Sequence, residues 1–123
     1  MVAESAADIL SSGKVGEPTK FYVDEWKTDI FIADPSAAVI DWVQEYIGNL
    51  PLDEEGKPRF SQRSAVEIAI RMLCNSKNEL LFSPEDIDKI METTKPAGWL
   101  QVLEHCSTFF VIDSKTLDEA TKN

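Results

Sequence analysis

The sequence predicts a mainly α protein, a small bundle of about four to five helices with a short N-terminal β segment or hairpin. Apolar residues recur at helical spacing in several long segments. Serine, aspartate and proline residues stand where those helices would begin, and one stretch rich in aromatic and β-branched residues precedes them. With 123 residues and 43% hydrophobic content, the chain has the size and composition of one domain with one core.

We divide the chain into three parts. Residues 1–19 form a short helix, which Gly13 ends, and a flexible connector of turn residues. Residues 20–112 form the helical domain, and residues 113–123 form a polar C-terminal tail.

The β segment opens the domain. Apolar and polar side chains alternate between Trp26 and Ile32, which is typical of a half-buried strand. Pairing of residues 22–24 with residues 29–31 would make this segment a hairpin, and the sequence does not clearly supply a further strand.

Two helices follow the β segment. The first, in residues 34–50, is predicted to have Asp34 as its N-cap and Pro35 at its first position. Ser61 is the predicted cap of the second, residues 62–74. That helix is apolar nearly all round, which is typical of the central helix of a bundle.

The segment "NSKNELLFSPED" has the outline of a calcium-binding loop. Such a loop needs oxygen ligands at positions 1, 3 and 5, an acid at 12 and glycine at 6. Counted from Asn75, position 3 is Lys77 and position 6 is Leu80, so the pattern excludes a calcium site. We interpret the segment as a polar turn, three apolar residues at 80–82 that dock on the core, and a new helix capped by Ser83.

The last helix, residues 96–111, carries more apolar residues than one stripe can hold. Leu100, Leu103, Cys106 and Phe110 are the predicted inward stripe. Neighbouring helical side chains diverge by about 100°, so the remaining apolar residues form a second face, which is typical of an interaction surface. The candidate partner-binding residues are Trp26, Trp99, Val102 and Phe109. The alternative is that the N-terminal strand segment covers this face within the monomer, through Trp26 or Ile30.

No arrangement typical of catalysis is present. The single histidine, His105, lies beside Cys106 on one helix, where the two side chains point apart. The sequence has no phosphate-binding glycine loop, no zinc-ligand spacing and no nucleophile motif, so we predict no catalytic residues, no cofactor and no metal.

The charge balance limits the classes of partner that the chain is expected to bind. The chain has 12 basic and 22 acidic residues, a net charge of −10, which repels both nucleic acid and anionic membranes. The N-terminus has neither a basic region nor a long apolar run, so we expect no signal peptide and no membrane span. In a protein of the cytoplasm, Cys74 and Cys106 are expected to be reduced and to act as small hydrophobes.

In the order of these signals, residues 20–112 resemble the tail assembly chaperones of long-tailed bacteriophages. The similar parts are "VDEWKTDIFI", the helix with Trp42 and Tyr46, the charged loop after it, and "AVEIAIRMLCNSKNELLFSPEDIDKIMETT". The turn commonly reads Asp-Glu-Asp-Gly in that family and is Asn-Ser-Lys-Asn here, which removes charge but keeps a turn.

The resemblance implies a non-enzymatic chaperone that acts in the host cell cytoplasm and is absent from the mature virion. It would bind the phage tape measure protein, keep it soluble and promote polymerisation of the tail tube protein around it. Whether the chain also binds further copies of itself is left open. The alternative is an acidic inhibitor or nucleic-acid mimic that occupies a basic cleft on a host protein, and its binding would weaken as salt increases.

Because Lys77 and Leu80 occupy ligand and turn positions, millimolar calcium should leave the melting temperature unchanged apart from its ionic-strength effect, which magnesium at equal concentration controls for. A rise of several degrees with calcium but not with magnesium would contradict our interpretation of this segment.

Overall fold

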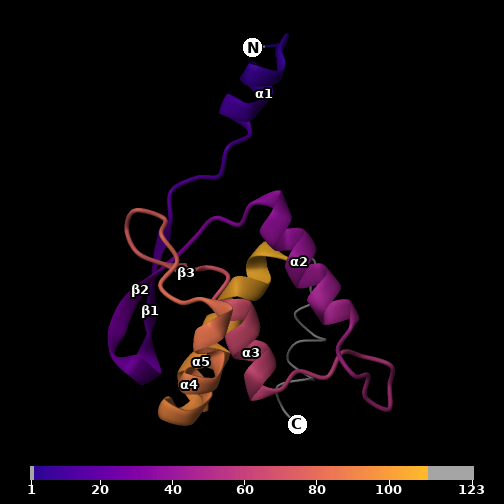
Figure 1. The fold of residues 1–123 in the computed structure, drawn as a ribbon, viewed down its shortest axis with the longest axis vertical. Helices are drawn as coiled ribbons and strands as arrows, with labels where there is room; N and C mark the ends of the chain where they lie inside the picture. Colours follow the sequence, from indigo (N-terminus) through magenta and orange to yellow (C-terminus); the bar gives the residue numbers. More distant parts are fainter. Residues whose placement is uncertain (1, 111–123) are drawn as a thin grey trace.

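A computed structural model describes residues 2–110. Within them the chain forms five α-helices and a three-stranded antiparallel sheet of order β1-β2-β3 (Figure 1). The prediction of a mainly α bundle is therefore wrong, because the protein has a mixed α and β fold. The sheet packs one face on the helices and begins with the hairpin that the sequence predicts.

The hairpin consists of β1 (Thr19–Val23) and β2 (Thr28–Ile32), joined by a 3-10 turn (Asp24–Trp26). Lys20 pairs with Phe31 and Tyr22 with Asp29, so residues 29–31 pair with residues 20–22 and not with residues 22–24 as predicted. Asp24 belongs to the turn. Lys27 closes the turn in a left-handed conformation, with φ 52°.

The third strand is the main departure from the prediction. Helix α3 (Gln62–Ala69) ends earlier than predicted, and β3 (Leu73–Cys74) pairs with residues 31 and 32 of β2. The Ala33 N–H also donates to the carbonyl of Met72, at 2.8 Å. An apolar run buried on all sides shows no periodicity that separates helix from strand, so the unpaired edge of β2 decides the outcome.

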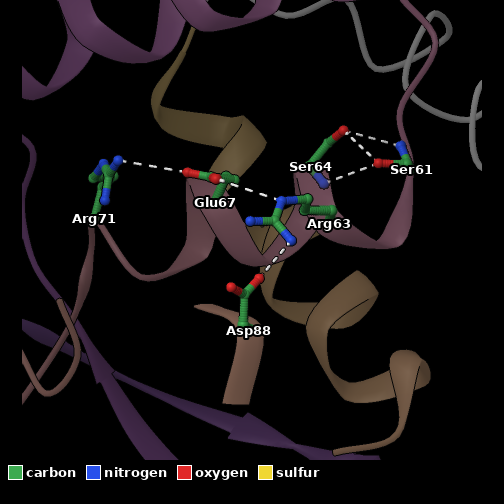
Figure 2. Close-up of polar contacts among 6 residues, drawn as sticks. All are labelled: Ser61, Arg63, Ser64, Glu67, Arg71 and Asp88. Carbon is green, nitrogen blue, oxygen red and sulfur yellow. Dashed lines mark hydrogen bonds and ion pairs between the residues drawn. The ribbon is translucent and has the colours of Figure 1, made fainter. Parts of the chain in front are cut away.

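Serine side chains cap the first three helices. Helix α2 (Ala37–Gly48) begins after Ser36, whose hydroxyl accepts the Val39 N–H, so the prediction of Asp34 as its cap and Pro35 as its first residue is wrong. At the start of α3 the predicted cap Ser61 is confirmed. Its backbone and side chain exchange hydrogen bonds with Ser64, at 3.0 and 3.1 Å (Figure 2).

The last two helices follow one another closely, and a 3-10 turn precedes the first of them. A 3-10 turn (Pro84–Asp86) leads into α4 (Ile87–Thr93), and the Asp86 carboxylate accepts both the N–H and the hydroxyl of Ser83. Helix α5 (Pro96–Cys106) begins at the predicted residue but ends in a 3-10 turn (Ser107–Phe109).

The core lies between the inner face of the sheet and helices α3, α4 and α5. Its largest fully buried side chains come from the sheet, from helices α2, α3 and α5, and from the turn between α3 and β3: Val23, Ile32, Val43, Val66, Ile68, Ile70, Met72, Val102 and Leu103. On α5 the inward stripe includes Trp99 and Val102, whereas Leu100 is only half-buried. The predicted stripe is therefore confirmed at Leu103, Cys106 and Phe110 and wrong at Leu100.

Helix α1 (Ala6–Ser12) projects from this body (Figure 1) and has no buried residue. The connector after it is held at Gly16, whose N–H donates to Asp34 at 2.7 Å and whose carbonyl accepts from Asn78 at 3.4 Å. The predicted C-terminal tail, residues 113–123, lies outside the described residues.

Gly98 determines where the hairpin packs on α5. A Cβ added at Gly98 would lie inside van der Waals distance of the Trp26 indole. Trp26 therefore rests directly on the backbone of α5, at the one residue of the helix that leaves room for it.

We predict that Gly98→Ala lowers the free energy of unfolding by about 1–3 kcal/mol, because the methyl group displaces a packed indole. Denaturant titration measures the loss. Gly48→Ala is the matched control, since a Cβ there meets nothing within 4 Å. Equal stability of the two variants would contradict the close packing of Trp26 on Gly98.

Candidate protein-interaction surface

The sheet has an outer face that none of the described helices covers. Strand residues directly opposite each other point to the same side of a sheet. The pairs Lys20–Phe31, Phe31–Cys74 and Cys74–Leu80 therefore place four side chains on one face. Tyr22 joins them because side chains two residues apart on a strand share a face. Figure 1 shows helices α3, α4 and α5 on the other side of the sheet.

This outer face exposes several large apolar side chains to solvent. Tyr22 is 51% exposed and Leu80 53% exposed, and Leu81 beside it is 52% exposed. Phe31 lies half-buried between them, and Lys20 and Asp29 supply the polar residues of the same face. We call Tyr22, Phe31 and Leu80 the outer-face patch. An antiparallel sheet usually presents alternate polar residues to water, so a continuous apolar patch is typical of a binding surface.

The loop that presents Leu80 is held by its own hydrogen bonds. The side-chain oxygen of Asn75 accepts the N–H groups of Lys77 and Glu79, at 2.9 and 3.0 Å. Asn78 adopts a left-handed conformation with φ 66°, and the Asn75 N–H then donates back to the carbonyl of Glu79. The segment is thus a closed polar turn that returns the chain to the sheet beside β3.

The structure corrects the prediction that residues 80–82 dock on the core. Phe82 does so, and its ring lies 6.3 Å from that of Trp99. Leu80 and Leu81 instead stand in solvent. The tight turn forces this outcome, because it pairs Leu80 with Cys74 on the outer face of the sheet.

Two of the four candidate partner-binding residues lie in the core. Trp99 is 3% exposed and Val102 is fully buried, so neither is available to a partner in this conformation. Trp26 and Phe109 are half-buried. The alternative, in which the N-terminal segment covers the second face of α5, is the arrangement observed.

Trp26 is the residue that covers this face. Its ring lies 4.9 Å from the ring of Trp99 at an interplanar angle of 75°, an edge-to-face pair. The indole N–H of Trp99 donates to the Thr94 hydroxyl at 2.8 Å, which satisfies its one polar group. A single sequence does not distinguish the two arrangements, because both place an indole beside α5.

A polar network on the helical side holds the scaffold behind the sheet. Arg63 lies between Asp88 of α4, at 2.9 Å, and Glu67, which also pairs with Arg71 (Figure 2). The guanidinium of Arg71 stacks 3.9 Å from the ring of Trp42, so the network also reaches α2. These ion pairs satisfy the charges of one another.

The other polar groups offer no catalytic centre in the described part of the chain. Both cysteines are free and buried, and burial raises the pKa of the Cys74 thiol and raises the pKa of Cys106 to about 12. Both therefore remain thiols at neutral pH. Within residues 2–110 no group of three or more metal-ligating side chains lies together. No helix there is both long enough and apolar enough to cross a membrane.

His105 joins β1 to α5. Its ring stacks on Phe21 with centroids 4.2 Å apart, and Phe109 meets it edge-on at 5.9 Å. The Nε2 atom is buried without a hydrogen-bond partner among the described residues, and desolvation lowers the pKa of the imidazole. The neutral ring thus acts as an aromatic packing residue.

Comparison with known proteins gives one structural similarity. No protein-family profile and no curated protein matches the chain. Among solved structures, the chain has weak structural similarity to the tail assembly chaperone of bacteriophage HK97. The TM-score is 0.47 at 16% sequence identity, and the match covers 97% of both chains.

The environment of His105 predicts a pH dependence of stability. Because its pKa is lowered in the folded protein, the unfolded chain binds the proton more readily. Stability is therefore complete above the unfolded pKa of about 6.5 and is lost as pH falls through that value towards the lower folded pKa. His105→Phe keeps the aromatic stack and removes the titrating group.

Denaturant titrations between neutral and mildly acidic pH should show a loss for the wild type that is smaller in His105→Phe. The same pH dependence in both proteins would mean that His105 does not contribute to it.

Proposed function

We propose that this chain is a non-enzymatic tail assembly chaperone of a long-tailed bacteriophage. It binds the tape measure protein, keeps it soluble and promotes polymerisation of the tail tube protein around it. It acts in the host cell cytoplasm and is absent from the mature virion. The observation that carries the proposal is the outer-face patch, and the sequence resemblance of residues 20–112 to this chaperone family supports the choice of client.

The patch suits an apolar helical client. It is formed by side chains of the sheet and of the turn next to β3, so it is held in place before the client arrives. Exposed aromatic and leucine side chains release water when an apolar helix face covers them, and each Å² buried stabilises the complex by about 25 cal/mol. Tyr22 keeps its hydroxyl at the edge of such a contact, which suits a surface that is wet when free.

The charge of the chain fits a protein that carries an insoluble partner. Lys20 and Asp29 lie on the same face as the patch and give it a polar border. The net charge of −10 then keeps the complex dispersed, because complexes of like charge repel one another. Affinity is expected to come from the apolar centre of the contact, and solubility from the acids around it.

The test is co-expression with the tape measure protein of the phage that encodes this chain. Tyr22→Ser and Leu80→Ser together should reduce the soluble fraction of that protein strongly, since large side chains at the centre of a contact carry most of the affinity. Because both residues are half exposed, the free energy of unfolding should change by no more than about 0.5 kcal/mol for each.

Leu52→Ser is the matched control. Leu52 is 62% exposed and lies in the loop between α2 and α3, away from the sheet. The control should solubilise the client as well as the wild type does. If the double variant also does so, the outer-face patch is not the client site. Binding instead to a DNA-binding protein, with affinity that falls as salt rises, would favour the acidic-inhibitor alternative.

A further inference from the structure

Strand β1 forms one edge of the sheet, and its outer edge is unpaired. Within residues 2–110 it pairs with β2 alone, and its backbone makes no hydrogen bond to any other element. The strand reads TKFYV, without proline, and its one charged residue, Lys20, points to the outer face rather than along the edge. An edge strand without a covering segment is a template for pairing with a further strand.

The hydrogen bonds of β2 show which backbone groups of β1 are free. The Ala33 N–H donates to Met72, the residue before β3, so the even-numbered residues of β2 direct their N–H and C=O groups to β1. Phe21 lies opposite one of these even-numbered residues and therefore bonds with β2. Because the direction alternates along a strand, the N–H and C=O groups of Lys20 and Tyr22 project from the free edge.

A cleft of about 310 Å³ lies between this strand and α5. It is lined by Phe21 of β1 and by Gln101, Glu104 and His105 of α5. The rings of Phe21 and His105 stack with centroids 4.2 Å apart, which makes one wall of the cleft rigid. The Glu104 side chain is exposed and forms no ion pair within residues 2–110, so its carboxylate gives the cleft a negative charge.

A strand added beside β1 would use the free edge and the cleft together. Its backbone would bond with the groups of Lys20 and Tyr22, as in other cases of strand addition to a sheet edge. Its side chain opposite Phe21 would point to the same face as that ring, and therefore to the cleft. A lysine or arginine at that position can lay its aliphatic stem on Phe21 and bring its charged end to Glu104.

The charge of the chain favours a basic occupant of this edge. The net charge of −10 attracts a basic segment and repels a second copy of the chain. An extended segment of another protein is therefore a better match than the β1 strand of a further copy.

We propose that the free edge of β1 binds an extended basic segment of a partner protein as an additional strand, with one lysine or arginine of the segment in the cleft beside Glu104. This contact goes beyond the proposed chaperone function. It recognises an extended backbone at the edge of the sheet, whereas the outer-face patch is proposed to take the apolar face of a helix.

The test follows hydrogen exchange in the isotope-labelled full chain by NMR. The probe is a short synthetic peptide of alternating threonine and valine with one central lysine. Binding should slow exchange at the amides of Lys20 and Tyr22 and leave Phe21 and Val23 nearly unchanged, because the last two already bond with β2. A peptide with glutamate in place of the lysine should bind about fivefold more weakly, because it loses the exposed ion pair with Glu104.

Two variants test the edge and the cleft separately. Lys20→Pro removes one N–H from the free edge without removing a bond to β2, and proline is tolerated on edge strands. It should bind the lysine peptide about two- to tenfold more weakly than Lys20→Ala, which loses the same side chain but keeps the N–H. Glu104→Gln should lose the preference for lysine over glutamate and keep the protection of the edge amides. Circular dichroism checks that all three variants are folded.

Failure of the lysine peptide to bind the wild type would overturn the proposal. Protection at amides other than Lys20 and Tyr22, or equal affinity of Lys20→Pro and Lys20→Ala, would also overturn it. Protection of the two edge amides without peptide, together with a doubled mass in light scattering, would assign the edge to a second copy instead. The measurement involves no tape measure protein, so its outcome is independent of the chaperone proposal.

Discussion

The close approach of Trp26 to Gly98 determines where the exposed apolar surface of this protein lies. A side chain at residue 98 would exclude the indole, and without the indole the edge of Trp99 would face water. With Trp26 seated, the hairpin is fixed on α5, and the His105–Phe21 stack continues the contact along β1. The inner face of the sheet therefore contributes Val23 and Ile32 to the core, and its outer face is the one that no described helix covers.

The protein has two exposed apolar features that differ in kind, the outer-face patch and helix α1. The outer-face patch is a preformed apolar surface on paired strands, which suits a client that supplies its own helix. Helix α1 is the reverse, a short apolar helix that lacks a surface. The hydrogen bonds at Gly16 hold the connector of this helix against the body of the protein.

The sequence predicts local features of the fold better than it predicts their partners. The Ser61 cap, the presence of a hairpin before the helices, and the start of α5 at Pro96 follow from turn chemistry and periodicity, whereas the register of the hairpin does not. Strand β3 was missed because a short apolar run that is buried on both faces has no period of its own. The exposure of Leu80 depends on its pairing with Cys74, and the burial of Trp99 depends on Trp26, more than 70 residues earlier in the chain. Such long-range contacts have no signal in a single sequence.

The packing of Trp26 on Gly98 is tested most directly by combining Trp26→Ala with Gly98→Ala and measuring the free energy of unfolding of the double variant. If the indole occupies the space above residue 98, the methyl group is harmless once the indole is gone. The double variant should then be at least as stable as Trp26→Ala alone, since alanine favours a helix over glycine by about 1 kcal/mol. Losses that simply add would mean that the two residues do not touch, and that the second face of α5 is open to a partner after all.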